Sequence, residues 1–433
     1  MNPAVARVPE WIPSERLQGA DVVPLHRNEN PYPPPAEVVV AVQKATARMV
    51  RLFPDPESSE LREAIARTLA VREDQVLVGA GSTELQGLAA QAFLAPGDRA
   101  GFPWPTTPYF EHLALMQGAE PVRLPWLDSS PEEALLDAPP DLKVLFLCNP
   151  NTPLGESIET YAISDFAHSH PRTLVVIDEA YEAFRGANAM KLVEEGMPNV
   201  LIVRSFSKAH ALAGLRLGYA IGHPEAIRAL RRAKSPYNVD VVAQSAGLAA
   251  WRNPGWVAQT AQRIRDTRES VRLEVQMRGF DVPSSDGNFF FLRGTDTFRL
   301  YQGLRERGII VRRYDEFEVR DGVRVSIGTD EQMNQFLAAI DSMLTSLPMR
   351  RSSSTMIKKL NFSLDAAAPA AAAADDEDED APAPADAPER LDDSLFEEFD
   401  MGSSAPDAKA APRGAERPQP KPNDSLFDEI DLH

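Results

Sequence analysis

Four short segments of the chain carry side chains whose types and spacing could do chemistry together. In one of them, Lys208 follows Ser205 and Ser207, and Arg216 comes eight residues after the lysine. A lysine that is desolvated near other cations has a lowered pKa and can act as a nucleophile. Hydroxyl groups beside an arginine can also hold a phosphate group. The spacing therefore predicts a reactive amine next to a phosphate site.

The other segments supply a carboxylate, backbone donors and a polar turn. Asp178 opens the run Asp-Glu-Ala-Tyr that ends at Tyr181, and its carboxylate could keep a ring nitrogen protonated. Gly81 and Ser82 open a predicted helix, whose free N–H groups and dipole favour an anion. The fourth segment is Asn149–Gly155. Together these parts suit pyridoxal phosphate, which carries an aldehyde, a phosphate, a pyridine nitrogen and a phenolic oxygen.

Each segment follows a short apolar run that is typical of a buried strand. The predicted strands cover residues 75–78, 144–148, 173–177 and 200–203, with helical stretches between them. This alternation predicts an α/β domain with a mostly parallel sheet, in which ligands bind at the carboxyl ends of the strands. Any one segment alone would have an ordinary explanation, such as a surface lysine or a capped turn. Their shared position after strands favours one common site.

The pattern changes after about residue 248, where a helix over 263–278 and strands at 288–292 and 323–327 predict a smaller α+β domain. We therefore expect an N-terminal arm with part of the small domain (1–45), a large cofactor-binding domain (46–248), a small C-terminal domain (249–350) and a tail (351–433). Residues 352–433 hold 20 Asp and Glu against 7 Lys and Arg. Such a segment buries too little apolar surface to fold, so we predict a disordered acidic tail.

The tail contains a duplicated acidic motif. Residues 392–400 read Asp-Asp-Ser-Leu-Phe-Glu-Glu-Phe-Asp, and residues 423–431 read Asn-Asp-Ser-Leu-Phe-Asp-Glu-Ile-Asp. Each copy places apolar side chains at positions i, i+1 and i+4, on one side of a short helix. One hypothesis is that both copies bind a groove of a protein partner, with avidity from the duplication. The alternative is a duplicated low-complexity segment that has no partner.

Composition argues against several other classes of protein. The 433 residues carry a net charge of −19, which argues against binding to nucleic acid or to an anionic membrane surface. One cysteine cannot form an internal disulfide, and the seven histidines have no metal-ligand spacing, so no metal is predicted. No apolar run is long enough to cross a bilayer, and the N-terminus lacks the pattern of a signal peptide. We expect a soluble protein of the cytoplasm.

These residues resemble those of a known family. Lys208, the stretch Leu212–Arg216 and the upstream Asp178–Tyr181 are similar to motifs of the fold-type-I pyridoxal-phosphate aminotransferases, and within them to the histidinol-phosphate aminotransferase branch. The further similar stretches are Asn28–Pro31, Phe53–Asp55 and Arg324–Thr329. The resemblance covers roughly residues 20–345 and none of the tail. It implies a fold-type-I transferase that works as a homodimer by ping-pong transamination.

The resemblance implies a role for each matching position. Lys208 would condense with the cofactor aldehyde and carry the proton of the substrate α-carbon, while Asp178 would bind the pyridine nitrogen and Tyr181 the phenolic oxygen. Arg324 would bind the carboxylate of glutamate or 2-oxoglutarate through a bidentate pair. Arg312 would help to bind the phosphate of histidinol phosphate, unless it is a solvated edge charge. The other implied residues are Ser82, Thr83, Tyr109, Asn151, Thr152, Ser205, Ser207 and Arg216 at the cofactor and Glu29 and Asn30 at the substrate.

Two positions near the cofactor depart from the family pattern. Thr152 stands where the family has an asparagine that meets the phenolic oxygen, so either the threonine hydroxyl or Asn151 would fill that role. Thr107 stands where the family has an aromatic side chain that stacks on the cofactor ring. Trp104 and Tyr109 are the nearby aromatic residues that could replace it.

The expected reaction is transamination of L-histidinol phosphate with 2-oxoglutarate, which yields imidazole-acetol phosphate and L-glutamate in histidine biosynthesis. Two activities of the same fold stay open, an aromatic amino-acid aminotransferase and a threonine-phosphate decarboxylase. A different class stays open too. Phe53 replaces a family tyrosine that reaches the neighbouring subunit's phosphate. These departures at Thr152, Thr107 and Phe53, together with the duplicated tail motif, suggest a second hypothesis. In it the protein is an adaptor whose folded part has weak activity and whose tail recruits a partner.

Overall fold

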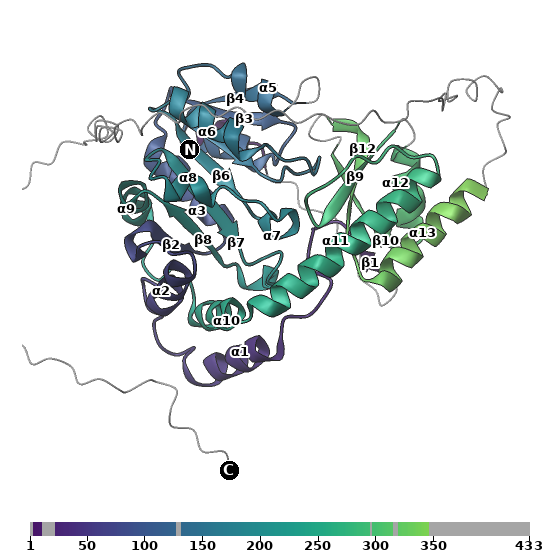
Figure 1. Ribbon diagram of the computed structural model, residues 1–433, viewed down its shortest axis with the longest axis horizontal. Coiled ribbons are helices and arrows are strands. Elements are labelled where there is room, and N and C mark those ends of the chain that lie inside the picture. Colours follow the sequence, from purple (N-terminus) through teal and green to yellow (C-terminus); the bar gives the residue numbers. More distant parts are fainter. Residues whose placement is uncertain (1–2, 11–21, 127–130, 295–296, 315–318, 346–433) are drawn as a thin grey trace, which may run out of the picture. The chain divides into compact units, whose positions relative to one another are not determined.

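The strands of the computed structural model form sheets of seven, three and two strands within the described residues, which are 3–10, 22–126, 131–294, 297–314 and 319–345 (Figure 1). All of these residues belong to one compact unit. The predicted tail and both of its acidic motifs lie outside the described residues. None of the described helices is both long and apolar enough to cross a membrane.

The seven-stranded sheet confirms the predicted α/β architecture. In spatial order its strands are β2 (Val76–Gly79), β8 (Gly218–Gly222), β7 (Val200–Ser205), β6 (Leu174–Asp178), β5 (Val144–Cys148), β3 (Arg99–Trp104) and β4 (Glu120–Pro125). The strands from β7 to β4 pair in parallel, whereas β8 runs antiparallel to both β7 and β2. The four predicted strands correspond to β2, β5, β6 and β7, and their ends agree to within two residues. The sequence analysis did not predict β3, β4 or β8.

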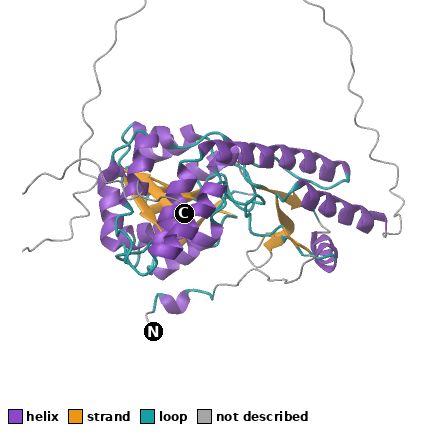
Figure 2. Cartoon of the chain, turned by 90° about the horizontal axis from the view of Figure 1, so that it is seen from below, coloured by secondary structure: helices purple, strands orange, loops and turns teal. Residues whose placement is uncertain are grey.

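The residue types of the central strands explain why the sheet is internal. Every residue of β5 and β6 is buried, and both strands consist almost entirely of apolar side chains. Such continuous apolar runs are what a parallel strand needs when helices cover both of its faces. Figure 2 shows helices packed around these strands.

Helices connect the strands and begin at recognisable residues. One of them, α3, starts directly after Gly81, whose φ of +88° is a conformation that favours glycine. The long helix α11 starts at Pro254 and runs toward α13 in Figure 1. The described α-helices are α1 (Ala36–Arg48), α2 (Ser59–Thr68), α3 (Ser82–Phe93), α4 (Tyr109–Met116), α5 (Pro131–Leu136), α6 (Thr160–Ser169), α7 (Glu182–Arg185), α8 (Met190–Glu194), α9 (Pro224–Ala233), α10 (Val241–Trp251), α11 (Pro254–Met277), α12 (Thr297–Glu306) and α13 (Asp330–Thr345).

The smaller sheets combine residues from both ends of the described chain. The three-stranded sheet is antiparallel and consists of β11 (Arg312–Tyr314), β12 (Val319–Ser326) and β9 (Phe289–Arg293). In the two-stranded sheet, β1 (Val23–Pro24) pairs in parallel with β10 (Ile309–Ile310). This pairing fits a small domain that includes part of the N-terminal arm. The domain boundaries at residues 45, 248 and 350 stay predictions.

Candidate active site

The carboxyl ends of the strands bring the predicted site residues to one edge of the sheet. In the pairing register, Asp178 of β6 lies beside Cys148 of β5. Ser205 of β7 lies beside Gly218 of β8, and Gly218 lies beside Gly79 of β2. The segments that follow β2, β5, β6 and β7 therefore start close together.

Lys208 lies in the loop after β7 and is partly buried. Its Nζ atom donates a hydrogen bond to the carbonyl oxygen of Arg27 at 2.9 Å. Burial, followed by the positive charge of Arg324, lowers the pKa of Lys208 to about 8; the charge of Arg216 acts in the same direction, and that of Glu29 opposes it. An amine with this pKa is half neutral at pH 8, so it can act as a nucleophile or accept a proton.

Asp178 is a buried carboxylate at the end of β6. It accepts hydrogen bonds from Nε2 of Gln86 at 2.7 Å and from the backbone N–H of Ala180 at 3.0 Å. Burial raises the pKa of Asp178 to about 6, against these two hydrogen bonds and the charge of Lys208. The carboxyl group is therefore anionic above that pH. A buried anion of this kind can pair with a protonated ring nitrogen.

Arg216, Ser207 and the start of α3 converge on one point. Nη1 of Arg216 donates to the hydroxyl of Ser207 at 3.0 Å, and the backbone N–H of Ser207 donates to the hydroxyl of Ser205 at 3.0 Å. A Cβ atom at Gly81 would lie only 2.7 Å from Nη2 of Arg216. Glycine therefore lets the guanidinium approach the N-terminus of α3. A guanidinium, hydroxyl groups and a helix N-terminus together suit a phosphate group.

Tyr181 and the N-terminal segment both lie close to Lys208. Nδ2 of Asn28 donates to the hydroxyl oxygen of Tyr181 at 3.0 Å, and Nδ2 of Asn30 donates to the carbonyl oxygen of Ala209 at 3.1 Å. The Nζ atom of Lys208 lies 5.7 Å from the centre of the Tyr181 ring. Burial raises the pKa of Tyr181, so its hydroxyl stays protonated and can donate its own hydrogen. The segment that includes Asn30 therefore contacts the loop of the predicted amine.

Arg324 of β12 brings the three-stranded sheet into the same site. Its buried guanidinium donates to the hydroxyl of Thr152 at 2.8 Å, to that of Tyr314 at 2.6 Å and to the carbonyl oxygen of His26 at 2.7 Å. Its Nε atom is buried and has no hydrogen-bond partner within the described part of the chain. Arg312 of β11 lies directly opposite Arg324 in the antiparallel register. Directly opposed residues share one face of a sheet, so both arginines lie on the same face.

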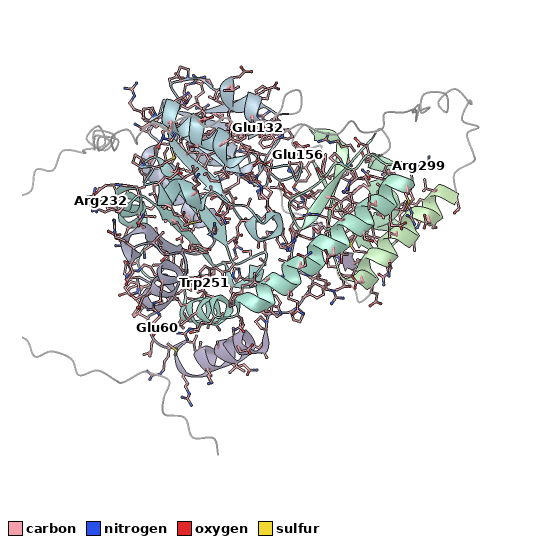
Figure 3. The ribbon with its side chains drawn as sticks, viewed as in Figure 1. Glu60, Glu132, Glu156, Arg232, Trp251 and Arg299 are labelled. Atoms are coloured by element: carbon pink, nitrogen blue, oxygen red, sulfur yellow. The ribbon has the colours of Figure 1, made fainter. Side chains whose placement is uncertain are left out.

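Polar contacts connect the turn after β5 to the region around β9. Glu156, labelled in Figure 3, accepts from Nη2 of Arg293 at 3.3 Å and from Nε1 of Trp126 at 2.9 Å. The hydroxyl of Ser157 donates to Asp286 at 2.7 Å. These contacts help to hold Arg324 of the smaller sheet beside the edge of the larger one.

Thr152 and Asn151, the two candidates for the contact to the phenolic oxygen, both lie in the turn after β5 but have different hydrogen-bond partners. The hydroxyl oxygen of Thr152 accepts from Arg324, which leaves its hydrogen to donate. Asn151 is fully buried, and its amide is bonded to the carbonyl oxygen of Pro105 at 2.9 Å and the hydroxyl of Thr106 at 2.7 Å. The geometry therefore favours Thr152 for a contact to the phenolic oxygen. Both cofactor contacts stay predictions.

Tyr109 is better placed than Trp104 for a contact to the cofactor. The Trp104 ring lies 4.1 Å from the guanidinium carbon of Arg123. Tyr109 begins α4, and its hydroxyl donates to the carbonyl oxygen of Thr83 in the first turn of α3 at 3.1 Å. Tyr109 therefore lies beside the predicted phosphate site, and ring stacking by Tyr109 stays a prediction.

The sequence analysis missed Gln86, although it contacts Asp178 directly. Gln86 lies four residues after Ser82, on the same face of α3, and its neighbours Leu85 and Ala89 are buried apolar residues. A polar side chain among buried apolar residues was the available signal. Tyr314 was likewise outside the predicted site, because only the fold brings its hydroxyl to Arg324.

A further cavity of about 420 Å³ lies apart from this site. It is lined by residues of α12 and α13, among them Leu300 and Ile340, and by none of the predicted site residues. Within the described ranges, no group of three or more His, Cys, Asp or Glu side chains could hold a metal ion.

The chain is similar to known proteins over most of its length. The sequence model of the family described as "Aminotransferase class I and II" matches residues 20–340. The histidinol-phosphate aminotransferase of Synechocystis sp. is 35% identical over 352 residues, which cover 80% of this chain and 99% of that protein. The histidinol-phosphate aminotransferase of Gluconacetobacter diazotrophicus is 36% identical over 349 residues, which cover 79% and 98% respectively.

Solved structures share the fold. The structure of histidinol-phosphate aminotransferase from Sinorhizobium meliloti in complex with pyridoxal-5′-phosphate has a TM-score of 0.73 at 24% identity and covers 80% of this chain and 98% of that chain. L-threonine-O-3-phosphate decarboxylase from Porphyromonas gingivalis has a TM-score of 0.67 at 23% identity, with coverages of 75% and 100%. Both likenesses concern the fold alone, which is the predicted fold-type-I architecture. By its family match and its curated relatives, the chain belongs to the class I and II aminotransferases and is a pyridoxal-phosphate-dependent enzyme.

Proposed function

We propose that this enzyme transfers the amino group of L-histidinol phosphate to 2-oxoglutarate, forming imidazole-acetol phosphate and L-glutamate. The observation that carries the proposal is the facing pair of arginines, Arg312 and Arg324, of which Arg324 is close enough to the amine of Lys208 to lower its pKa. Two cations on one face suit substrates that carry a phosphate or a second carboxylate. The names of the curated relatives, which this chain matches over nearly their whole length, support the same substrate.

The side chains present fit pyridoxal phosphate. Lys208 provides an amine that is half neutral at about pH 8, and Asp178 provides a buried anion for the ring nitrogen. Arg216 approaches the helix N-terminus closely because Gly81 has no Cβ atom. We assign the phosphate to Ser82, Thr83, Ser205, Ser207 and Arg216, and the phenolic oxygen to Tyr181 and Thr152.

When bound, pyridoxal phosphate supplies an aldehyde carbon and a conjugated ring that withdraws electrons from the α-carbon of the substrate. Asp178 holds the proton on the ring nitrogen, which keeps the ring electron-poor. Tyr181 donates a hydrogen bond to the phenolic oxygen. The Nζ atom of Lys208 accepts the proton of the substrate α-carbon. These roles need a neutral lysine and an ionised aspartate. Asp178 loses its proton around pH 6 and Lys208 around pH 8, so both required forms predominate above about pH 8.

The arginine pair serves the two substrates in turn. In a ping-pong reaction, glutamate and histidinol phosphate occupy the site one after the other. We propose that Arg324 binds the carboxylate of glutamate or 2-oxoglutarate through its unpartnered Nε edge, and that Arg312 contacts the phosphate of histidinol phosphate. Glu29 and Asn30 lie close to the Lys208 loop and would line the same substrate site.

We further propose that the enzyme is a homodimer. Large apolar side chains are exposed along α1 and the loop after it, and Phe53 is 84% exposed. The other exposed apolar residues there are Val39, Val40, Val50 and Leu52. An exposed apolar patch along one stretch of the chain is typical of a surface that a second copy covers.

The proposal is tested by a substrate panel. The full-length enzyme with pyridoxal phosphate is given histidinol phosphate, phenylalanine or threonine phosphate, and glutamate and carbon dioxide are measured. We expect glutamate from histidinol phosphate and 2-oxoglutarate, with no turnover by Lys208→Ala. An Arg312→Gln variant should raise the KM for histidinol phosphate more than the KM for glutamate. Preferred turnover of phenylalanine, or carbon dioxide from threonine phosphate, would contradict the proposal.

The tail is a separate question, because its motifs lie outside the described residues. Recruitment of a protein partner by residues 392–400 and 423–431 stays a prediction, as does a cytoplasmic location. Deleting residues 352–433 should leave turnover unchanged, since the site residues all precede the deletion. A large fall in turnover would instead give the tail a role in catalysis.

A further inference from the structure

Gln86 is a buried polar residue that the proposed chemistry does not yet use. It lies on α3, its side chain is only 3% exposed, and its Nε2 atom donates to Oδ2 of Asp178 at 2.7 Å. The two residues are 92 positions apart. Burying an amide among apolar side chains costs free energy unless the amide is hydrogen-bonded. Here the amide N–H group donates to the carboxylate of Asp178, the residue that we assign to binding the ring nitrogen of the cofactor.

The ionised groups around Asp178 leave its charge partly uncompensated. Lys208, in the loop after β7, favours the ionised carboxylate, while Glu179, the residue directly after β6, disfavours it. Glu179 is itself paired with Arg204 of β7, with an N–O distance of 2.8 Å. On β5, the neighbouring Cys148 stays a neutral thiol because burial raises its pKa. From α3 the group that meets Asp178 is the neutral amide of Gln86.

We propose that Gln86 is a positioning residue that keeps Asp178 ionised and oriented for the ring nitrogen of the cofactor. The inference rests on the proposed function, because it matters only if Asp178 binds that nitrogen. The amide N–H group donates most strongly to a carboxylate that carries negative charge, so the contact favours the ionised form. It also fixes one carboxylate oxygen, while the other accepts from Ala180.

The opposing effects on the pKa of Asp178 show why a hydrogen-bond donor is needed at this carboxylate. Burial raises the pKa of Asp178 to about 6, and the hydrogen bond from Gln86 is the largest of the opposing effects. Without that bond the carboxyl group would keep its proton to a higher pH. A protonated aspartate has no charge to hold a protonated ring nitrogen, so affinity for the cofactor would fall in the neutral range.

The test compares Gln86→Met with the parent enzyme and with Gln91→Met. Methionine has a similar length and helix propensity but no donor. Gln91 is an exposed residue of the same helix, so its variant controls for the substitution itself. The dissociation constant of pyridoxal phosphate is measured by absorbance titration between pH 5 and pH 8.5. The ionisations of free cofactor are common to all three proteins and cancel in the comparison.

We expect affinity in the parent enzyme to fall below about pH 6, as Asp178 becomes protonated. In Gln86→Met this fall in affinity at acid pH, the acid limb of the curve, should occur about one to two pH units higher. That shift corresponds to the free energy of a hydrogen bond to a charged group. Gln91→Met should follow the parent. Superimposable limbs for Gln86→Met and the parent would overturn the inference. Absence of cofactor binding by the parent enzyme would show instead that the proposed function itself is wrong.

A second measurement covers the case in which Gln86→Met folds poorly. A donor that stabilises the anion contributes stability mainly where Asp178 is ionised. The difference in Tm between the parent and Gln86→Met, both without cofactor, should therefore be larger at pH 8 than at pH 5. A merely structural glutamine would lower Tm equally at both pH values, and that result would overturn the inference.

Discussion

A buried ion pair next to the active site allows a quantitative test of the structure. Glu179 follows Asp178 in sequence, and its Oε2 atom accepts from Nε of Arg204 at 2.9 Å. The two side chains are 1% and 6% exposed. The other carboxylate oxygen accepts from the backbone N–H of Ala189 at 2.5 Å. The pair therefore joins the ends of β6 and β7, which carry the aspartate and lysine of the site.

Replacing Glu179 with leucine should destabilise the protein strongly. Arg204 would remain a buried cation without its main counter-ion, a loss that typically costs about 3–5 kcal/mol. The carboxylate of Glu182 is close enough to act on Arg204 and stays in place, so we expect the lower end, about 3 kcal/mol. Exchanging both partners for apolar residues, in Glu179→Leu with Arg204→Met, should recover much of the loss, because no unpaired charge stays buried.

The assay is urea unfolding at 25 °C, followed by tryptophan fluorescence. The matched control is the exposed pair of Glu63 and Arg67 on α2, whose N–O distance is 2.6 Å and whose side chains are 52% and 75% exposed. Breaking that pair should cost only about 0.3–0.5 kcal/mol. If Glu179→Leu costs no more than the control, or if the double variant is less stable than either single one, the reasoning from burial is refuted.

Three further predictions concern the cofactor and the apolar patch. Uptake of pyridoxal phosphate by the cofactor-free enzyme should accelerate with rising pH around a midpoint near pH 8, because only the neutral amine of Lys208 attacks the aldehyde. In Arg324→Gln, which lacks a cation that lowers the lysine pKa, stopped-flow absorbance should show this midpoint at a higher pH. Gly81→Ala should weaken binding of pyridoxal phosphate about tenfold or more but should not weaken binding of pyridoxal. The reason is that a Cβ atom 2.7 Å from Nη2 of Arg216 would displace the guanidinium that binds the phosphate. Equal losses for both compounds would contradict the phosphate site. Leu52→Glu should shift the mass measured by light scattering from dimer toward monomer, whereas an unchanged mass would place the dimer interface elsewhere.

The residue types around each strand made most of the fold predictable. A run such as Val144–Cys148 is apolar throughout, and only a strand covered on both faces buries such a run completely. Polar residues that follow such a run closely, as Asp178 does directly and Lys208 does five residues after Val203, must lie near the edge of the sheet. The strand β8 was missed because the short segment Gly218–Gly222 begins and ends with glycine and resembles a turn.

The sequence by itself determined which groups are available for chemistry, because strand burial and helix starts depend on residues close together in the chain. The contacts among those groups depend on elements far apart in sequence, and only the tertiary structure decided them. Arg324 meets Thr152 across 172 residues, and Gln86 meets Asp178 across 92. Local patterning cannot encode such pairs, because they arise when the two sheets and α3 pack together. The pKa values of Lys208 and Asp178 follow from the same packing, since burial is the largest influence on each.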